Sequence, residues 1–214
     1  MGNKNKLAKF AEIREFSNVF EHNEAPKGKW SSVFKNDNPI VLELACGKGE
    51  YTLGLAQLFS DKNFIGVDIK GNRIWRGAKT ATDENIPNAA FLRCQIGRIT
   101  DYFSHEEVSE IWITFADPQP RDGKAKKRLT HLNFIKKYIE ISIKPLIINL
   151  KCDSTLLYEF TKEVIHENNF KTLVDVDDVY NWDERPEELN IQTFYEKMWL
   201  EEGKKIKYLR FSVG

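Results

Sequence analysis

Hydrophobic residues follow two alternating patterns along most of this 214-residue chain. Short runs that are almost entirely apolar are typical of buried strands in a parallel sheet. Such runs span residues 40–44, 64–67, 90–94, 111–116 and 146–151, and two further segments, 170–176 and 206–213, are also predicted to be strands although polar residues interrupt them. Between the runs, apolar residues recur at helical spacing, as Tyr51, Leu55 and Leu58 do after the first one. This alternation predicts an α/β protein with a doubly wound, largely parallel sheet that is covered by helices on both faces.

The first 30 residues differ from the rest of the chain. They begin polar and basic, and Phe10, Ile13, Phe16 and Phe20 recur at helical spacing. A docked amphipathic helix and a frayed tail both agree with this pattern. We therefore expect an N-terminal basic arm or helix over residues 1–30, followed by one larger domain over residues 31–214.

A glycine turn follows the first predicted strand and opens the first predicted helix. Gly47 and Gly49 are separated by one residue, and Asp68 lies 19 residues beyond Gly49, after the second strand. A strand, a glycine turn and a helix form the usual nucleotide-cofactor site of a doubly wound sheet, and an acidic residue at about this spacing meets ribose hydroxyls. A turn that merely closes a strand–helix unit is the alternative interpretation.

The residues around this turn favour S-adenosylmethionine over a dinucleotide. The third glycine of the dinucleotide motif is absent: its place holds Thr52, or Glu50 if the motif is counted from Ala45. A glutamate there would repel pyrophosphate, which normally lies at the helix N-terminus. S-adenosylmethionine has no phosphate and carries a sulfonium and an ammonium, so Glu43 in the strand suits it. The residues expected to bind the cofactor are Glu43, Gly47, Gly49, Asp68 and, at the end of the third strand, Gln95.

Asp117 follows the fourth predicted strand and is itself followed by two prolines. Pro118 comes directly after it and Pro120 two residues later, so the chain here favours extended or turn geometry. Ligands bind outside the carboxyl ends of strands in open sheets. Asp117 is therefore the candidate catalytic residue, with a strand-ending turn and a capping aspartate as the alternative.

A basic loop comes next. Five cations surround one carboxylate, Asp122: they are Arg121, Lys124, Lys126, Lys127 and Arg128. Such a loop beside a cofactor site makes a phosphate-contact patch, although a solvated surface loop has the same composition.

Composition limits the other possibilities. The formal net charge is zero, so the distribution of charge has to decide whether nucleic acid binds. No apolar run approaches 18 residues, and the N-terminus has no apolar secretory core, so we expect a cytoplasmic protein without a membrane anchor. Cys46, Cys94 and Cys152 lack metal-ligand spacing and are expected to be reduced, buried thiols. The four histidines are scattered, so no metal site is predicted.

Taken together, these motifs resemble the tRNA (guanine-N7)-methyltransferase family. The likeness covers about residues 34–212 and rests on four stretches: 38–43 with Gly47 and Gly49, 115–120, 126–130, and 193–196 with Gly203 and Ile206. The glycine motif is common to many methyltransferases, whereas the other stretches are more specific. This chain departs from the family pattern in having Ala45 for Gly, Asp68 for Glu, Gln95 for Asp and Gln119 for Trp.

The resemblance implies a Rossmann-like methyltransferase fold with a seven-stranded, mostly parallel sheet whose last strand is antiparallel. It also implies methylation of guanosine N7 in the tRNA variable loop, with Asp117 as the catalytic carboxylate. It implies that the substrate is bound by Arg121, Asp153, Thr193 and Glu196, and the RNA backbone by Lys124, Lys126, Lys127 and Arg128. The expected partner is tRNA, and the chain could act as a monomer or as a homodimer.

Three other functions remain open at this point. The chain could methylate another RNA position or a small molecule. It could be a non-catalytic RNA-binding protein on a methyltransferase scaffold, since Ala45 and Gln95 depart from the pattern. An NAD-dependent dehydrogenase is disfavoured by Glu50 and Thr52.

Overall fold

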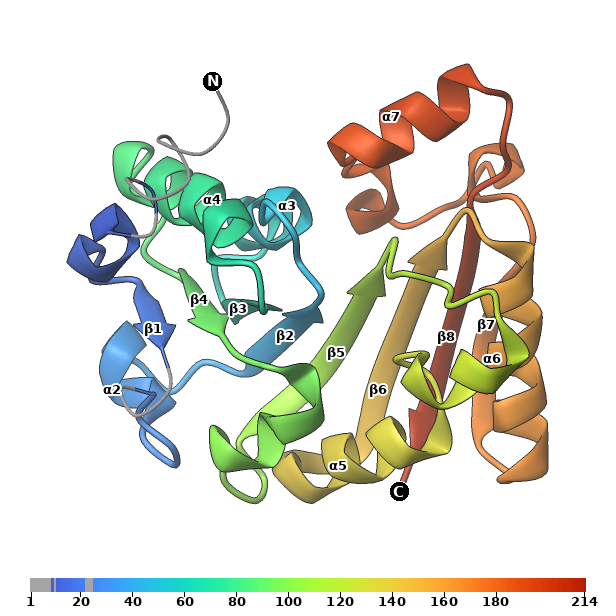
Figure 1. The fold of residues 1–214 in the computed structure, drawn as a ribbon, viewed down its shortest axis with the longest axis horizontal. Coiled ribbons are helices and arrows are strands. Elements are labelled where there is room, and N and C mark those ends of the chain that lie inside the picture. The colour runs from blue at the N-terminus through green and yellow to red at the C-terminus, as the bar shows by residue number, and fades with distance from the viewer. Residues whose placement is uncertain (1–8, 10, 22–24) are drawn as a thin grey trace.

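One sheet of eight strands runs through the described part of the protein. The computed structural model describes residues 9, 11–21 and 25–214. The strands are β1 (Val19–Glu21), β2 (Ile40–Leu44), β3 (Asn63–Asp68), β4 (Ala89–Arg93), β5 (Val108–Thr114), β6 (Ser142–Cys152), β7 (Lys171–Val176) and β8 (Lys207–Val213). Their order across the sheet is β1-β4-β3-β2-β5-β6-β8-β7 (Figure 1). Among the described strands, β8 alone runs opposite to the other seven, and it pairs antiparallel with both β6 and β7. The predicted doubly wound sheet with an antiparallel last strand is therefore confirmed.

The sheet has one strand more than expected, and the N-terminal segment supplies it. The strand β1 forms one edge of the sheet and pairs parallel with β4, with Val19 opposite Phe91. The helical interpretation of the early apolar residues is thus wrong at Phe20, which lies in this strand. Residues 9, 11 and 12 are helical, and Ile13–Glu15 forms a 3-10 turn in which Ile13 is fully buried. The rest of the predicted basic arm, including residues 1–8 and Phe10, lies outside the described residues.

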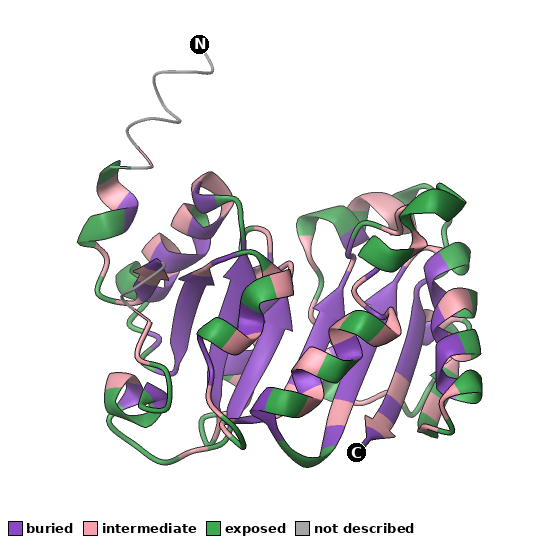
Figure 2. Ribbon diagram, turned by 60° about the horizontal axis from the view of Figure 1, so that its bottom comes forward, coloured by how far each residue is buried: buried purple, intermediate pink, exposed green. Residues whose placement is uncertain are grey.

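Helices cover both faces of the sheet (Figure 2). The α-helices are α2 (Trp30–Phe34), α3 (Glu50–Leu58), α4 (Gly71–Asp83), α5 (Leu132–Ile141), α6 (Thr155–Glu167) and α7 (Phe194–Glu201). The 3-10 turns beyond residue 15 are Ile96–Asp101, Asp122–Lys127, Val179–Asn181 and Glu187–Asn190. None of the helices in the described ranges is long and apolar enough to cross a bilayer.

Two apolar cores lie on opposite faces because side chains alternate along each strand. In β2, Leu42 and Leu44 belong to the core that contains the buried apolar residues of α5 and α6. Val41 belongs to the other core, which contains the buried apolar residues of α3 and α4. A strand that is apolar on both faces needs both layers, which is why β2 is buried at every position.

Phe91 in β4 explains why glycine is required at three separate positions. Its ring is fully buried, and a Cβ built on Gly49, Gly66 or Gly77 would lie 2.4, 2.9 or 2.6 Å from a ring carbon, respectively. These positions bring the start of α3, the middle of β3 and the middle of α4 close to one ring. Gly49 also has φ +72°, a conformation that residues with a Cβ rarely adopt.

Replacing Gly49 by alanine is expected to destabilise the fold. The new Cβ would overlap the Phe91 ring and would have to adopt φ +72°. Overpacking and backbone strain together predict a loss of about 2 kcal/mol or more in the free energy of unfolding, measured by urea denaturation. Gly123→Ala is the control, because nothing lies within 4 Å of a Cβ there. Equal stability of the two variants would contradict the packing argument.

Candidate functional site

Two adjoining pockets open at the carboxyl ends of the central strands. The chain runs from β2 towards β3 on one side and from β5 towards β6 on the other, so the strand order reverses between β2 and β5. This is where ligands bind in open α/β sheets. The first pocket, of about 340 Å³, is lined by Ala45, Asp68, Ile69, Cys94, Gln95, Ile96, Gly97, Leu129 and Phe134. The second is lined by Glu43, Ala45, Cys46, Gly47, Lys48, Glu50, Arg73, Thr114, Phe115, Thr193 and Tyr195.

Asp68 joins the glycine turn to the end of β3. Its side chain is largely buried, and its two oxygens accept hydrogen bonds from the backbone N–H groups of Gly47 (3.0 Å) and Lys70 (2.8 Å). Ala45 has φ +62° and Gly47 has φ +58°, so the chain turns sharply after β2. The structure therefore brings Asp68 and Gly47, two of the predicted cofactor residues, into direct contact.

Glu43 lies in β2 beneath the second pocket and is almost fully buried. It accepts hydrogen bonds from the Thr52 backbone N–H (2.8 Å) and from the hydroxyls of Thr52 and Thr114. Burial raises the pKa of its carboxyl group from 4.5 to about 7, although these hydrogen bonds act in the opposite direction. Glu43 thus ties β2 to α3 and β5, and it places a titratable group below the pocket.

Gln95 follows β4 at the mouth of the first pocket. Its side chain is exposed and lies at the start of the Ile96–Asp101 turn. Ile69, Ile96, Leu129 and Phe134 give this pocket apolar walls. Four of the predicted cofactor residues, Glu43, Gly47, Asp68 and Gln95, therefore line two pockets that share Ala45, whereas Gly49 lines neither of them.

Asp117 is exposed in the segment that follows β5. Its Oδ1 accepts a hydrogen bond from the backbone N–H of Gln119 at 2.9 Å. Phe115 and Gln119, on either side of it, have φ +49° and +47°. Non-glycine residues in this conformation store strain, and they persist only where the surrounding structure holds them.

Arg128 supplies part of that restraint. Its Nε donates to the Pro118 carbonyl at 3.1 Å and its Nη2 to the Gln119 carbonyl at 3.3 Å. Its guanidinium also lies over the Phe160 ring at 4.5 Å, and the residue is only 6% exposed. The structure thus does not place Arg128 with the exposed cations of the basic loop, with which the sequence had grouped it. Those that remain exposed are Arg121, Lys124, Lys126 and Lys127.

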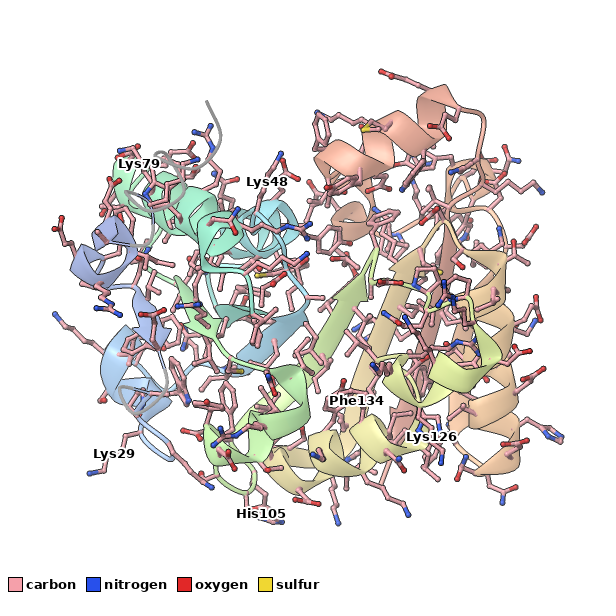
Figure 3. All side chains as sticks on the ribbon, in the orientation of Figure 1. Lys29, Lys48, Lys79, His105, Lys126 and Phe134 are labelled. Carbon is pink, nitrogen blue, oxygen red and sulfur yellow. The ribbon has the colours of Figure 1, made fainter. Side chains whose placement is uncertain are left out.

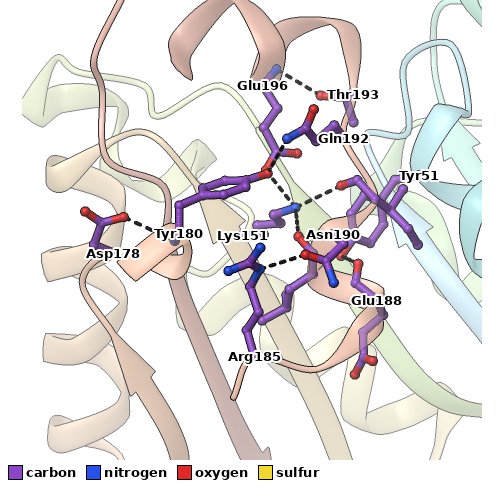
Figure 4. Close-up of polar contacts among 12 residues, drawn as sticks. Tyr51, Lys151, Asp178, Tyr180, Arg185, Glu188, Asn190, Gln192, Thr193 and Glu196 are labelled. Carbon is purple, nitrogen blue, oxygen red and sulfur yellow. Dashed lines mark hydrogen bonds and ion pairs between the residues drawn. The ribbon is translucent and has the colours of Figure 1, made fainter. Parts of the chain in front are cut away.

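Glu196 in α7 forms a buried ion pair with Lys151 in β6 (Figure 4). Their charged atoms are 2.7 Å apart, and both side chains are fully buried. Burial raises the pKa of Glu196 and lowers that of Lys151. Glu196 also accepts from the Tyr180 hydroxyl at 2.9 Å, whereas its Oε2 has no partner among the described residues. Glu196 therefore anchors the first turn of α7, and its role towards a substrate stays a prediction.

The Lys151 ammonium holds a second segment of chain over the end of the sheet. It donates to the carbonyls of Leu189 and Ile191, each at 2.9 Å (Figure 4). These carbonyls lie just before Thr193, whose hydroxyl caps α7 by accepting from the Glu196 N–H at 3.1 Å. Thr193 is thereby placed at the second pocket, where it is a lining residue. Asp153 is half-buried and directly follows β6.

The lining residues of the second pocket include Lys48, Glu50, Arg73 and Tyr195, which were not singled out from the sequence as site residues. Glu50 accepts from the Phe194 backbone N–H at 2.9 Å, and the Lys48 ammonium lies 4.4 Å from the centre of the Phe194 ring. Tyr195 and Arg73 line the pocket. An aromatic residue inside the 193–196 motif was a usable signal for Tyr195. Arg73 gave none, because a cation in an amphipathic helix is usually just solvated.

No cluster of metal-ligating side chains occurs within the described part of the chain. Cys46, Cys94 and Cys152 are unpaired and buried, as expected. Burial raises the pKa values of Cys94 and Cys152 to about 12, so both remain neutral thiols at physiological pH.

Comparisons with known proteins agree with this architecture. The sequence profile of a family described as "Putative methyltransferase" matches residues 37–209. The tRNA (guanine-N(7)-)-methyltransferase of Christiangramia forsetii is 48% identical over 223 aligned residues and the alignment covers 100% of both chains. The protein of the same name from Bacteroides fragilis is 47% identical, with 97% of this chain and 85% of that one covered.

Solved structures support the fold independently. The 16S rRNA methyltransferase KamB matches with a TM-score of 0.67 at 11% identity, covering 90% of this chain and 95% of its own. An antibiotic-related methyltransferase matches with a TM-score of 0.63 at 14% identity, covering 87% and 92%. At such low identity these structures show a shared methyltransferase fold and nothing finer.

The raised pKa of Glu43 predicts how stability changes with pH. Between pH 4.5 and about 7 the folded protein keeps a proton that the unfolded chain has lost, so this group makes the free energy of unfolding fall as pH rises. The shift corresponds to a contribution of up to about 3 kcal/mol across that interval. Glu43→Gln should remove this contribution and flatten the profile, measured by urea denaturation from pH 4.5 to 8.

The control for this experiment is Glu163→Gln, which removes a carboxylate from an exposed position of α6. Its pH profile should run parallel to that of the wild type. If the Glu43→Gln profile also runs parallel, Glu43 does not titrate in this range.

Proposed function

This chain belongs to the tRNA (guanine-N(7)-)-methyltransferase family, and from that premise we propose that it transfers a methyl group from S-adenosylmethionine to N7 of a guanosine in the variable loop of tRNA. The observation that carries the proposal is the place of Asp117. This exposed carboxylate follows β5 two residues after Phe115, which lines the second pocket.

The residues of the two pockets fit the proposed cofactor. The apolar walls of the first pocket suit a purine ring, and Gln95 at its mouth offers hydrogen bonds. The Asp68 carboxylate suits ribose hydroxyls. Glu43 below the second pocket suits a cationic amino-acid end, which would favour its ionised form. When bound, S-adenosylmethionine would supply an electrophilic methyl group.

The chemistry of guanine N7 makes few demands on the protein. This nitrogen has a free lone pair and no proton, so no general base is needed. The protein has to hold the base in line with the methyl group, which is a matter of positioning. The purine becomes cationic as the bond forms, so a fixed carboxylate such as Asp117 would stabilise the developing charge. The target base also has to leave its stack, at a cost of a few kcal/mol.

Asp117→Ala is expected to bind S-adenosylmethionine normally but to methylate tRNA about 100-fold more slowly, because a preorganised charge is removed. Binding is measured by calorimetry, and 7-methylguanosine is measured by mass spectrometry after the pure protein is mixed with tRNA and cofactor. Asp122→Ala is the control, since it removes an exposed carboxylate from the neighbouring loop. Near-normal turnover by Asp117→Ala would refute its role, and no product from the wild type would refute the proposed function.

The basic loop should divide into two kinds of residue. Replacing the exposed Lys124, Lys126 and Lys127 by alanine should weaken tRNA binding and lower its salt dependence by a slope of roughly 0.7–0.9 for each phosphate that is no longer neutralised. Arg128→Ala should leave that slope unchanged and lower kcat, because Arg128 holds the carbonyls of Pro118 and Gln119 beside Asp117.

Equilibrium binding across a salt series and steady-state kinetics separate these outcomes. A lower salt slope for Arg128→Ala would show that this residue binds phosphate after all. An unchanged slope for the triple lysine variant would identify the loop as merely solvated.

A further inference from the structure

A row of cations on α4 and the basic loop lie on opposite sides of the two pockets, whose shared opening we call the cofactor mouth (Figure 3). Lys70, Arg73 and Arg76 are spaced three residues apart, so they are neighbours on one stripe of the helix surface. Lys48, in the glycine turn, lines the same pocket as Arg73. We call these four residues the α4 rim.

The cations of the α4 rim have no carboxylate partners within the described residues. The ion pairs of this part of the chain include Lys79 with Asp83 at the far end of α4, but none of the four rim residues. Lys48, Lys70 and Arg76 are exposed, and Arg73 is half-buried at the pocket. Like charges at this helical spacing repel one another. Such a row is stabilised by a polyanion that lies across it.

The position of the rim decides which polyanion it fits. Lys70 follows Asp68 by two residues, and Arg73 lines the second pocket, so the row begins at the cofactor mouth. It then continues along α4, where Arg76 lies about 9 Å beyond Lys70 at the helical rise per residue. The exposed lysines of the basic loop lie on the other half of the molecule: Figure 3 shows Lys48 beside α3 and α4 and Lys126 far from it, near α6.

We propose that the α4 rim is a second phosphate-binding surface, which holds a segment of the tRNA backbone different from the one held by the loop at residues 121–127. This inference rests on the proposed function for its ligand. A nucleotide that enters a pocket between two cationic surfaces carries its backbone towards both. Contacts on either side would fix the direction of entry, whereas one loop alone would leave the RNA free to pivot.

The helical residues before β1 pack against α4, the helix that carries three cations of the α4 rim. Glu12 accepts a hydrogen bond from the indole of Trp75 at 2.9 Å, and the Lys9 ammonium lies 4.2 Å from the centre of the same ring. Trp75 is on α4 between Arg73 and Arg76. The N-terminal segment thus packs on the rim helix and brings one more cation, Lys9, to it.

The test is the Lys70→Ala/Arg76→Ala double variant, with Arg73 left intact because it lines the cofactor pocket. Binding of unfractionated bacterial tRNA is measured across a salt series by equilibrium titration, which does not depend on methyl transfer. With two fewer phosphates neutralised, the salt slope should fall by about 1.4–1.8 and binding should weaken roughly 10-fold or more at 0.15 M salt. KM for tRNA should rise with kcat little changed, and affinity for S-adenosylmethionine should stay at the wild-type value.

The matched control is Lys29→Ala/Lys171→Ala, which removes the same total charge from exposed positions at the start of α2 and on β7. If the rim variant binds tRNA no more weakly than this control, the proposal is overturned. Combined with the triple lysine variant of the basic loop, the rim variant should show fold decreases in affinity that multiply, as expected for separate binding surfaces. No additional decrease in the combined variant would mean that both surfaces hold the same segment, which also overturns the proposal.

If the wild type binds tRNA in this way but forms no 7-methylguanosine, the proposed reaction fails and the binding surface stands. If it forms the product and the rim variant matches its control, the reaction stands and the rim proposal fails.

Discussion

The packing of one aromatic ring sets the geometry on which the site depends. Phe91 fills the space left by three glycines, and two of them, Gly49 and Gly77, lie at α3 and α4. Any larger side chain at these positions would push a helix away from the sheet. Because α3 begins at the glycine turn and α4 follows Asp68, displacing either helix would pull Gly47 and Asp68 apart. The two pockets thus depend on a contact made in the apolar core beneath them.

A second constraint fixes the late part of the chain over the same pockets. The pair formed by Lys151 and Glu196 is fully buried, and removing two charges from water is costly, so the pair adds little net stability by itself. The contribution of the pair is to fix the position of α7 relative to β6. The Lys151 ammonium also binds the carbonyls of Leu189 and Ile191, so one group on β6 holds both the approach to α7 and its first turn. Thr193 then has a defined place at the pocket although it lies in a loop-rich region.

The sequence predicted what depends on local pattern. The run at residues 40–44 became β2 with the same bounds, because buried parallel strands are marked by largely apolar runs, and the predicted strands after it appeared in order. The three-residue β1 was missed since its apolar residues continue a helical spacing and its partner, β4, is distant in the sequence, with Val19 pairing Phe91.

Contacts between distant segments also decided the geometry of the candidate site. Arg128 is one more cation in a basic run until Phe160 is known to lie beneath it. Glu196 looked available to a substrate until Lys151 was found beside it.

The carboxylates around the two pockets differ in how many hydrogen bonds their oxygens already accept from the protein. Glu43, Asp68 and Glu50 each accept hydrogen bonds from backbone N–H groups, and Glu43 also from hydroxyls, so all three are used in part to hold the chain together. Asp117 accepts one hydrogen bond, from the Gln119 N–H to Oδ1, and its Oδ2 has no partner among the described residues. Under the proposed function, the purine gains positive charge. It then needs a fixed carboxylate with an oxygen that is free of protein hydrogen bonds and accessible to the substrate. On that proposal Asp117 would meet this need, because the strained residues on either side of it restrict its backbone, and this restriction would supply the preorganisation that electrostatic catalysis requires.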